Sequence, residues 1–411
     1  MSGVLPKRVV ITGISAVTPV GPTIEATFQG LLEKKNGIRK LTESDMEFIN
    51  NIKIHSGGPL DGWDLELWKK KAGTVKSMYH ALGVCTAWTA LEDAKWKPSN
   101  EEQYTRTGIM YGSARTSSPD ISIAHREVVK HGYGRLDRII LTKLIPSMIV
   151  GSVTIPHHIC GFSNSIVSGN CTGTNAIGDA YRTVGFGEAD VMIAGSAEHD
   201  FDALVYDSLI KGNYGFNLQV DQNPSEASRP FDKARNGWVY GIGAGCVILE
   251  ELSHALKRGA HIYAEVVGYS MLSEGGDETA KAGTGVLRTM KRAIRDNPVD
   301  AVFADAPGYG SWDEGEANAI EQMFGKKVDV SAIKGSIGHL NSASSSVNVA
   351  VAAYSLHKGM VPPIRNLTNP VNGNVNFVMN PVKKDLRGLV ANSVNYDGTA
   401  FGSIVLKKYT N

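Results

Sequence analysis

The sequence predicts an α/β protein in which a largely parallel sheet is covered by helices on both faces. Short β-branched runs alternate with segments of helical spacing through both halves of the 411 residues, and such alternation is typical of parallel sheets. Apolar residues make up 42% of the chain and charged residues 20%, with no low-complexity tract. This composition supports a packed core and excludes a disordered, collagen-like or coiled-coil chain.

The first half contains five predicted strands and two long helices. The strands are expected at residues 8–14, 108–112, 165–168, 190–197 and 245–250, and the helices at 76–94 and 172–186. The first helix follows from Leu82, Cys85 and Leu91, which lie among apolar residues at helical spacing. Residues 113–160 are irregular with helical pieces, which indicates an insertion over one end of the sheet.

The second half, which begins with a strand near 262–268, repeats this style. Further strands are expected at 301–304, near Val328, at 388–394 and at 402–408, with helices at about 280–296, 314–324 and 344–358. We therefore divide the chain into halves of residues 1–252 and 253–411. Because no Pro- or Ser-rich linker separates them, we expect the halves to pack as one layered unit.

The charge balance excludes a general role in binding polyanions. Lys and Arg number 42 and Asp and Glu 41, so the net charge is only +1. Such a chain has no broad basic field for nucleic acid or an anionic membrane. No apolar run reaches the roughly 18 residues of a spanning helix, and the apolar run after Lys7-Arg8 is broken at Gly13. We therefore expect a cytoplasmic protein without a targeting or membrane segment.

One of the four cysteines stands apart by its sequence context. Cys85, Cys160 and Cys246 lie within apolar patterns, and no C-x-x-C pair occurs, so the sequence predicts neither a zinc site nor a disulfide framework. Cys171 instead lies in Gly169-Asn-Cys-Thr-Gly173, the glycine spacing of a nucleophile elbow between a strand and a helix. A helix N-terminus there would favour the thiolate and hold a developing oxyanion. The alternative is a structural cysteine beside a glycine turn.

A second candidate site segment is Lys334-Gly-Ser-Ile-Gly-His339, which precedes the helix at 344–358. Its glycines predict a tight loop that places Lys334 and His339 in one cavity. A neutral histidine in such a cavity can act as an acid, a base or a hydrogen-bond donor. The alternative is an exposed lysine and a capping histidine.

Taken in order, these motifs resemble the β-ketoacyl-acyl carrier protein synthases of the elongating type, over nearly the whole chain. The matching segments are 8–13, the Cys171 elbow, 189–198, 227–232, 237–239, 243–250, 334–339 and the C-terminal Asn392-Ser393 with 397–399. The resemblance implies a thiolase-like fold of two related halves, layered as an α-β-α-β-α sandwich. It also implies an acyl carrier protein as partner, whose phosphopantetheine arm carries the substrate. The enzyme itself would need no cofactor, and it would form a homodimer or pair with a second ketosynthase-like subunit.

The resemblance also assigns roles to individual residues. Cys171 would be the nucleophile that takes the acyl chain, and Lys334 and His339 the lysine and second histidine of the site. The backbone N–H groups of Cys171 and Tyr396 would form the oxyanion hole. Trp238 and Tyr396 would line the substrate channel, and no metal is expected.

Three positions depart from the pattern of these synthases. Counting back from Glu316 puts Asp305 where the first histidine of the site is expected. A carboxylate there donates no hydrogen bond and repels the malonyl carboxylate and a thiolate, so it would raise the pKa of the cysteine. The carboxylate expected nine residues after His339, as a partner for the lysine, is replaced by Asn348, and the terminal Gly-Phe-Gly-Gly gate by residues 395–398.

Three functions remain open on these residues. The first is a condensing enzyme with an atypical Cys171, Asp305 and His339 arrangement, in which Asp305 orients His339 or works protonated. The second is a non-extending partner subunit like the chain-length factors of type II polyketide synthases, which the stretch 303–306 resembles. The third is an acyltransferase of the same fold. The retained Cys171 favours the first, since a purely structural subunit needs no activated thiol.

Overall fold

A computed structural model describes residues 6–72, 77–212, 223–274, 283–395 and 399–410. Its main sheet has eleven strands in the order β12-β10-β9-β14-β15-β8-β1-β7-β6-β4-β5. Along the chain these are β1 (Val9–Val17), β4 (Thr107–Gly112), β5 (Ser163–Ile166), β6 (Val191–Glu198), β7 (Gly243–Glu251), β8 (Ala264–Leu272), β9 (Ala301–Phe303), β10 (Asp329–Ser331), β12 (Asn376–Phe377), β14 (Gly388–Val394) and β15 (Phe401–Lys407). Two small ladders pair β2 (Arg39–Lys40) with β3 (Ser56–Gly57) and β11 (Met360–Val361) with β13 (Val382–Lys383).

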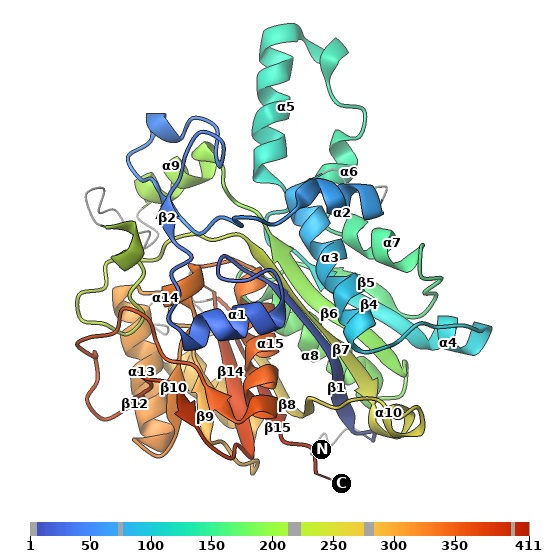
Figure 1. The fold of residues 1–411 in the computed structure, drawn as a ribbon, viewed down its shortest axis with the longest axis vertical. Helices are drawn as coiled ribbons and strands as arrows, with labels where there is room; N and C mark the ends of the chain where they lie inside the picture. Colours follow the sequence, from blue (N-terminus) through green and yellow to red (C-terminus); the bar gives the residue numbers. More distant parts are fainter. Residues whose placement is uncertain (1–5, 73–76, 213–222, 275–282, 396–398, 411) are drawn as a thin grey trace.

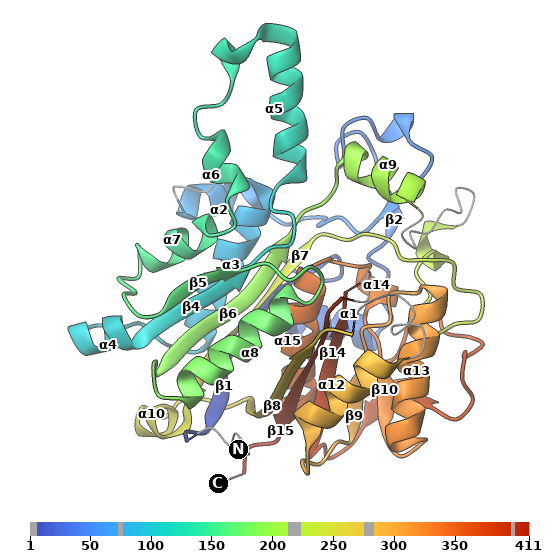
Figure 2. The same cartoon turned by 180° about the vertical axis from the view of Figure 1, so that it is seen from behind.

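The helices lie on both faces of this sheet, as the sequence predicts (Figures 1 and 2). They are α1 (Ile24–Leu32), α2 (Leu65–Ala72), α3 (Met78–Asp93), α4 (Glu101–Arg106), α5 (Ser118–His131), α6 (Ile140–Leu144), α7 (Met148–Thr154), α8 (Thr172–Gly185), α9 (Ala203–Gly212), α10 (Leu252–Lys257), α12 (Thr284–Ile294), α13 (Gly310–Phe324), α14 (Lys334–Ile337) and α15 (Ala343–Lys358). Short 3-10 turns occupy Ile49–Asn51, Tyr133–Arg135 and Pro224–Glu226. In the part of the chain that the structure describes, no helix combines the length and apolar character needed to span a bilayer.

The layers follow from what each helix contacts. Helix α3 packs on β1, β6 and β7 at one surface, and α12 packs on β8, β14 and β15 at the other. Helices α8 and α15 lie between, because each contacts strands of both halves of the sheet. The result is the five-layer arrangement of helix, sheet, helix, sheet and helix that the resemblance implies.

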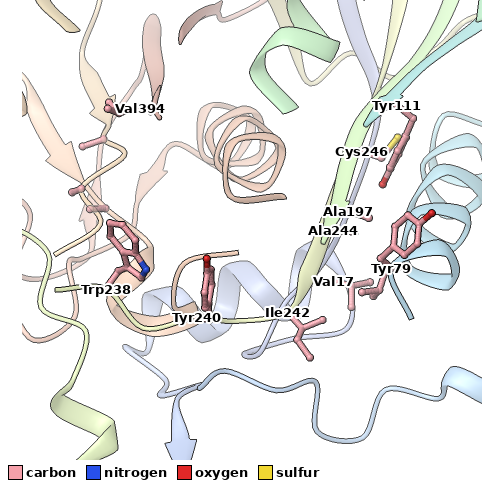
Figure 3. Packing of buried hydrophobic residues seen from close by; sticks show 14 of the residues in the cluster. Val17, Tyr79, Tyr111, Ala197, Trp238, Tyr240, Ile242, Ala244, Cys246 and Val394 are labelled. Atoms are coloured by element: carbon pink, nitrogen blue, oxygen red, sulfur yellow. The ribbon is translucent and has the colours of Figure 1, made fainter. Parts of the chain in front are cut away.

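The central helix α15 shows why this sequence fits the middle layer. Every residue from Ala343 to Leu356 is buried, and a helix buried all round carries small and apolar residues on every side. Its backbone lies so close to β7 that a Cβ on Gly245 would be 2.6 Å from the backbone nitrogen of Val347. Apolar residues from both outer layers form one further core cluster, of which Figure 3 shows Tyr79, Trp238 and others.

The prediction of a largely parallel sheet is wrong at its centre. Strands β4, β5 and β6 are parallel, as are β9, β10, β12 and β14. In between, β1 pairs antiparallel with both β7 and β8, and β15 pairs antiparallel with β8 and β14. Strands buried on both faces have continuous apolar runs in either orientation, so periodicity cannot distinguish the two. The pairing of β1 with β8 joins the two halves into one sheet.

The predicted insertion at 113–160 is helical, and its first part projects from the body, whereas α7 packs on α3 and β4. Figures 1 and 2 show α5 extending away from the layers, with α6 beside it. No residue of α5 is buried. Strand β5 begins and ends two residues before its predicted bounds, so that residues 167–171 form the turn that leads into α8.

Candidate active site

Cys171 occupies the turn between β5 and α8, as the elbow motif predicts. It is the residue that precedes α8, with φ −85° and ψ 3°, and it is fully buried. This is the sparsely populated bridge region, where many active-site residues lie. Its Sγ is 3.5 Å from the carbonyl oxygen of Ala400 in the C-terminal loop. The thiol therefore lies at the N-terminus of a fourteen-residue helix, where the aligned peptide dipoles favour a thiolate.

The two glycines of the elbow are required by geometry. Gly169 has φ +55°, the left-handed region that favours glycine. A Cβ on Gly173 would be 2.5 Å from the backbone nitrogen of Ser346 and 2.6 Å from the Oγ of Ser196. The absence of side chains thus lets the start of α8 pack directly against α15.

We predict that Gly173→Ala destabilises the protein by about 1–3 kcal/mol, because a methyl group here overpacks two layers. Gly151→Ala in α7 is the matched control, since its Cβ would meet nothing within 4 Å. Denaturant unfolding of both variants measures the difference. Equal unfolding free energies for the two alanine variants would contradict the close packing of α8 on α15.

His339 follows α14 in the second predicted segment, and it is buried rather than a surface cap. Its Nδ1 accepts a hydrogen bond of 3.0 Å from the backbone N–H of Asn341. Because Nδ1 is an acceptor, the ring proton of the neutral form is on Nε2. Burial, and then the charges of Lys334 and Arg115, hold the pKa of His339 well below its ordinary value. His339 is therefore a neutral N–H donor, and its Nε2 has no hydrogen-bond partner among the described residues.

Asp305 pairs with Lys334. The Oδ2 of Asp305 lies 2.8 Å from the Nζ of Lys334, and the two side chains are only 3% and 4% exposed. The approach angle is not that of a hydrogen bond, so the contact is mainly electrostatic. The hypothesis that Asp305 orients His339 has no support in this geometry, because Asn341 orients the ring and Asp305 faces the lysine.

A second buried carboxylate, Glu316 of α13, holds the Asp305 loop. It accepts hydrogen bonds from the backbone N–H groups of Asp305 and Ala306, at 3.1 and 2.9 Å, and from Asn392 Nδ2 at 3.0 Å. Burial and the adjacent charge of Asp305 raise the pKa of Glu316 to about 7. In the sequence, Glu316 serves only as the reference position from which Asp305 is located. A buried carboxylate beside a site residue also indicates a functional site, but its burial is visible only in the structure.

This pKa predicts a pH-dependent stability. The pKa of Glu316 is about 7 in the folded chain and near 4.5 when unfolded, so its contribution is complete below pH 4.5 and is lost as pH rises through 7. The loss over this window is about 3 kcal/mol of unfolding free energy. Relative to wild type, Glu316→Gln should therefore gain stability between pH 5 and 7 in denaturant titrations. Exposed Glu188→Gln is the control, and parallel curves for wild type and Glu316→Gln would contradict the shift.

Trp238, which the sequence predicts to line the substrate channel, lies beside His339. Its ring centroid is 5.6 Å from that of His339 and 5.9 Å from that of Trp312, and it is 1% exposed. Tyr396, predicted for the oxyanion hole and the channel, lies outside the described residues. Its neighbour Asn395 accepts a hydrogen bond of 3.2 Å from the backbone N–H of Asn170.

Hydrogen bonds place the segments that carry the predicted site residues around one helix, α15. The elbow contacts α15 through Thr174, whose backbone N–H donates to Ser345 Oγ at 3.2 Å. Asn348 of α15 donates to the carbonyl oxygens of Phe303 and Asn392, at 3.0 and 3.2 Å. The cysteine elbow, the Lys–His loop, the Asp305 loop and the C-terminal loop therefore converge around the N-terminal half of α15.

This five-layer fold, in which a strand-turn-helix elbow enters the middle layer, is the thiolase-like fold. The N-terminal domain profile of β-ketoacyl synthase matches residues 6–255, and the C-terminal domain profile matches residues 263–368. The chain therefore belongs to the β-ketoacyl synthase family, whose members condense acyl units in fatty-acid and polyketide biosynthesis.

Named relatives agree with this assignment, and solved structures share the fold. The chain is 34% identical over 393 residues to the mitochondrial 3-oxoacyl-[acyl-carrier-protein] synthase of Arabidopsis thaliana, covering 89% of this chain and 85% of that one. It is 33% identical to 3-oxoacyl-[acyl-carrier-protein] synthase 2 of Rhizobium meliloti (strain 1021), covering 98% and 99%. Two structures of 22% identity share the fold over 98% of this chain and 100% of theirs. One is a type II polyketide synthase ketosynthase in complex with its acyl carrier protein (AntDE:AntF), at TM-score 0.87, and the other the ishigamide ketosynthase/chain length factor, at 0.85.

Proposed function

We propose that the chain takes an acyl group from an acyl carrier protein onto Cys171 and extends it with a malonyl unit. The observation that carries this proposal is the buried thiol at the N-terminus of α8, which a purely structural subunit does not need. The carrier protein, with its phosphopantetheine arm, is the substrate partner. Both relatives named above are 3-oxoacyl-[acyl-carrier-protein] synthases, which supports the same reaction class for this chain.

The acyl transfer step follows from the elbow. Sγ of Cys171 attacks the carbonyl carbon of the carrier thioester and forms a new C–S bond. The bond from that carbon to the carrier sulfur breaks, and the carrier thiol leaves with the proton of Cys171. Backbone N–H groups at the start of α8 stabilise the transient oxyanion.

In the extension step the malonyl thioester loses CO2, and its electron pair becomes an enolate. His339 donates its Nε2–H to the enolate oxygen, since the ring is neutral and Nδ1 is already an acceptor. The carbanion then attacks the acyl carbon on Cys171 and releases the sulfur. Asp305 supplies no second donor, and its charge is offset by Lys334 instead.

A chain-length-factor-like partner subunit is the second candidate. The observation that favours it is the buried carboxylate of Asp305, which disfavours a malonyl carboxylate beside it. In that role the chain would shape the acyl cavity of a heterodimer while the other subunit turns over.

The test is mass spectrometry of the intact protein with acyl carrier protein substrates, alone and with an active ketosynthase subunit. A mass increment on the Cys171 peptide, followed by an extended product with malonyl carrier protein, is the expected result. An increment without extension would indicate an acyltransferase. No increment, combined with faster turnover by the other subunit, would overturn the proposal in favour of the partner role.

A further inference from the structure

The hydrogen bond that orients His339 comes from a residue in an unfavourable backbone conformation. Asn341 has φ +49°, in the left-handed region, which asparagine visits more often than other non-glycine residues but which is still uncommon for it. Its backbone N–H is the donor to Nδ1 of His339. Whatever holds Asn341 in this conformation therefore also fixes which nitrogen of His339 carries the proton.

The side chain of Asn341 is anchored by a buried carboxylate. Its Nδ2 donates to Oδ2 of Asp200 at 2.6 Å, and both residues are 2% exposed. A short bond to a carboxylate in a dry interior is stronger than a neutral hydrogen bond. Asp200 lies just after β6, in a part of the chain 141 residues from Asn341, so tertiary structure alone creates this contact.

Asp200 is itself held in place by neighbouring polar groups. Ser118 Oγ donates to its Oδ1 at 3.3 Å, and Arg115 Nη1 lies 3.4 Å from its Oδ2. The same Arg115 nitrogen donates to the hydroxyl of Tyr240 at 2.7 Å. The backbone on both sides of Tyr240 bonds His339, through Val239 O and the N–H of Gly241. Asp200, Arg115 and Tyr240 thus complete a closed polar ring around the histidine loop.

We propose that Asp200 is a positioning residue, which holds Asn341 in its left-handed conformation so that His339 presents Nε2–H to the substrate. This deepens the proposed function, because it names what fixes the donor that the extension step uses. Asp200 acts through Asn341 and touches no reacting atom. Without it, Asn341 relaxes toward ordinary backbone angles, and the proton of His339 is no longer confined to Nε2.

The test reads the tautomer of His339 by ¹⁵N NMR of the full-length, histidine-labelled protein, with His339→Gln to assign the signal. In wild type we expect Nε2 protonated and Nδ1 bare. Asp200→Ala should populate the other tautomer and lower kcat for malonyl-carrier decarboxylation by up to about 10²-fold with little change in KM. Asp200→Asn, which preserves the shape of the side chain, should have a smaller effect in the same direction.

Glycine at 341 provides the decisive control, because glycine adopts φ +49° without an anchor. Asn341→Gly should keep the wild-type tautomer, and Asp200→Ala should have no further effect on the tautomer in that background. Asp202→Asn, two residues away at the start of α9, should leave the tautomer unchanged. A folded Asp200→Ala protein with the wild-type tautomer would overturn the proposal. The proposal would also be overturned if Asp200→Ala changed the tautomer as much in the Asn341→Gly protein as in wild type. The tautomer is read without turnover, so failure of the proposed function is a separate result.

Discussion

Replacing Cys171 by Ala will abolish covalent acylation of the protein and reduce any chain extension by at least about 10⁴-fold, the usual scale for loss of a catalytic nucleophile. We expect this loss because the Cys171 thiol is the proposed acyl acceptor. It lies at the N-terminus of α8, and its Sγ is close to the C-terminal loop at Ala400. Intact mass after incubation with an acyl carrier protein measures the first effect, and product analysis measures the second.

Cys160→Ala is the matched control, because Cys160 is the exposed cysteine of the four, whereas Cys171 is buried in the elbow. It should retain the full mass increment. An increment that persists in Cys171→Ala and disappears in Cys160→Ala would show that the acyl group is carried on an exposed thiol, and would remove Cys171 from the reaction. The Cys171→Ala variant should fold normally, since alanine fills most of the space of the buried Cys171 side chain.

The cysteine elbow was predictable because its requirements are local. Gly169 must adopt a positive φ and Gly173 must admit the backbone of α15, and both needs leave a mark within five residues of sequence. Lys334 and His339 are likewise only five residues apart, so their shared loop follows from its glycines. Resemblance to a known family then supplied the five-layer fold that spacing alone does not give.

The partners of the buried charges were not predictable in this way. Asp305 could be placed by register, but its partner Lys334 comes from a different strand-to-helix connection, after β10. Asp200 and Asn341 were missed altogether, because a carboxylate after one strand and an amide after one loop have no signature until the fold brings them to 2.6 Å. The antiparallel centre of the sheet was not predicted for a related reason, since strand orientation is decided by chain connections and not by side-chain periodicity.

The buried pair of Asp305 and Lys334 should have the largest effect on stability. Asp305→Ala leaves the ammonium group of Lys334 buried without its carboxylate, and breaking such a pair costs about 3–5 kcal/mol. Lys334→Met in the same chain removes the unpaired charge, so the double variant should recover much of the loss. Denaturant unfolding of the two single variants and the double variant measures the coupling. Additive losses would show that the two side chains do not interact.

The same pair governs whether a histidine at 305 restores extension. Asp305→His introduces an N–H donor, but it also leaves Lys334 unpaired, because the amide of Asn348 provides no negative charge. Asn348 donates to the carbonyl of Phe303, two residues before Asp305, so a glutamate at 348 would lie beside the same loop. We therefore expect Asp305→His alone to be unstable and slow, and Asp305→His with Asn348→Glu to decarboxylate malonyl carrier protein at least about tenfold faster than wild type. The contrary result would be an Asp305→His protein that is as stable and as fast as the double variant. It would show that the carboxylate at 305 is not needed to neutralise Lys334, and so that Asp305 does not take the place of the carboxylate expected at 348.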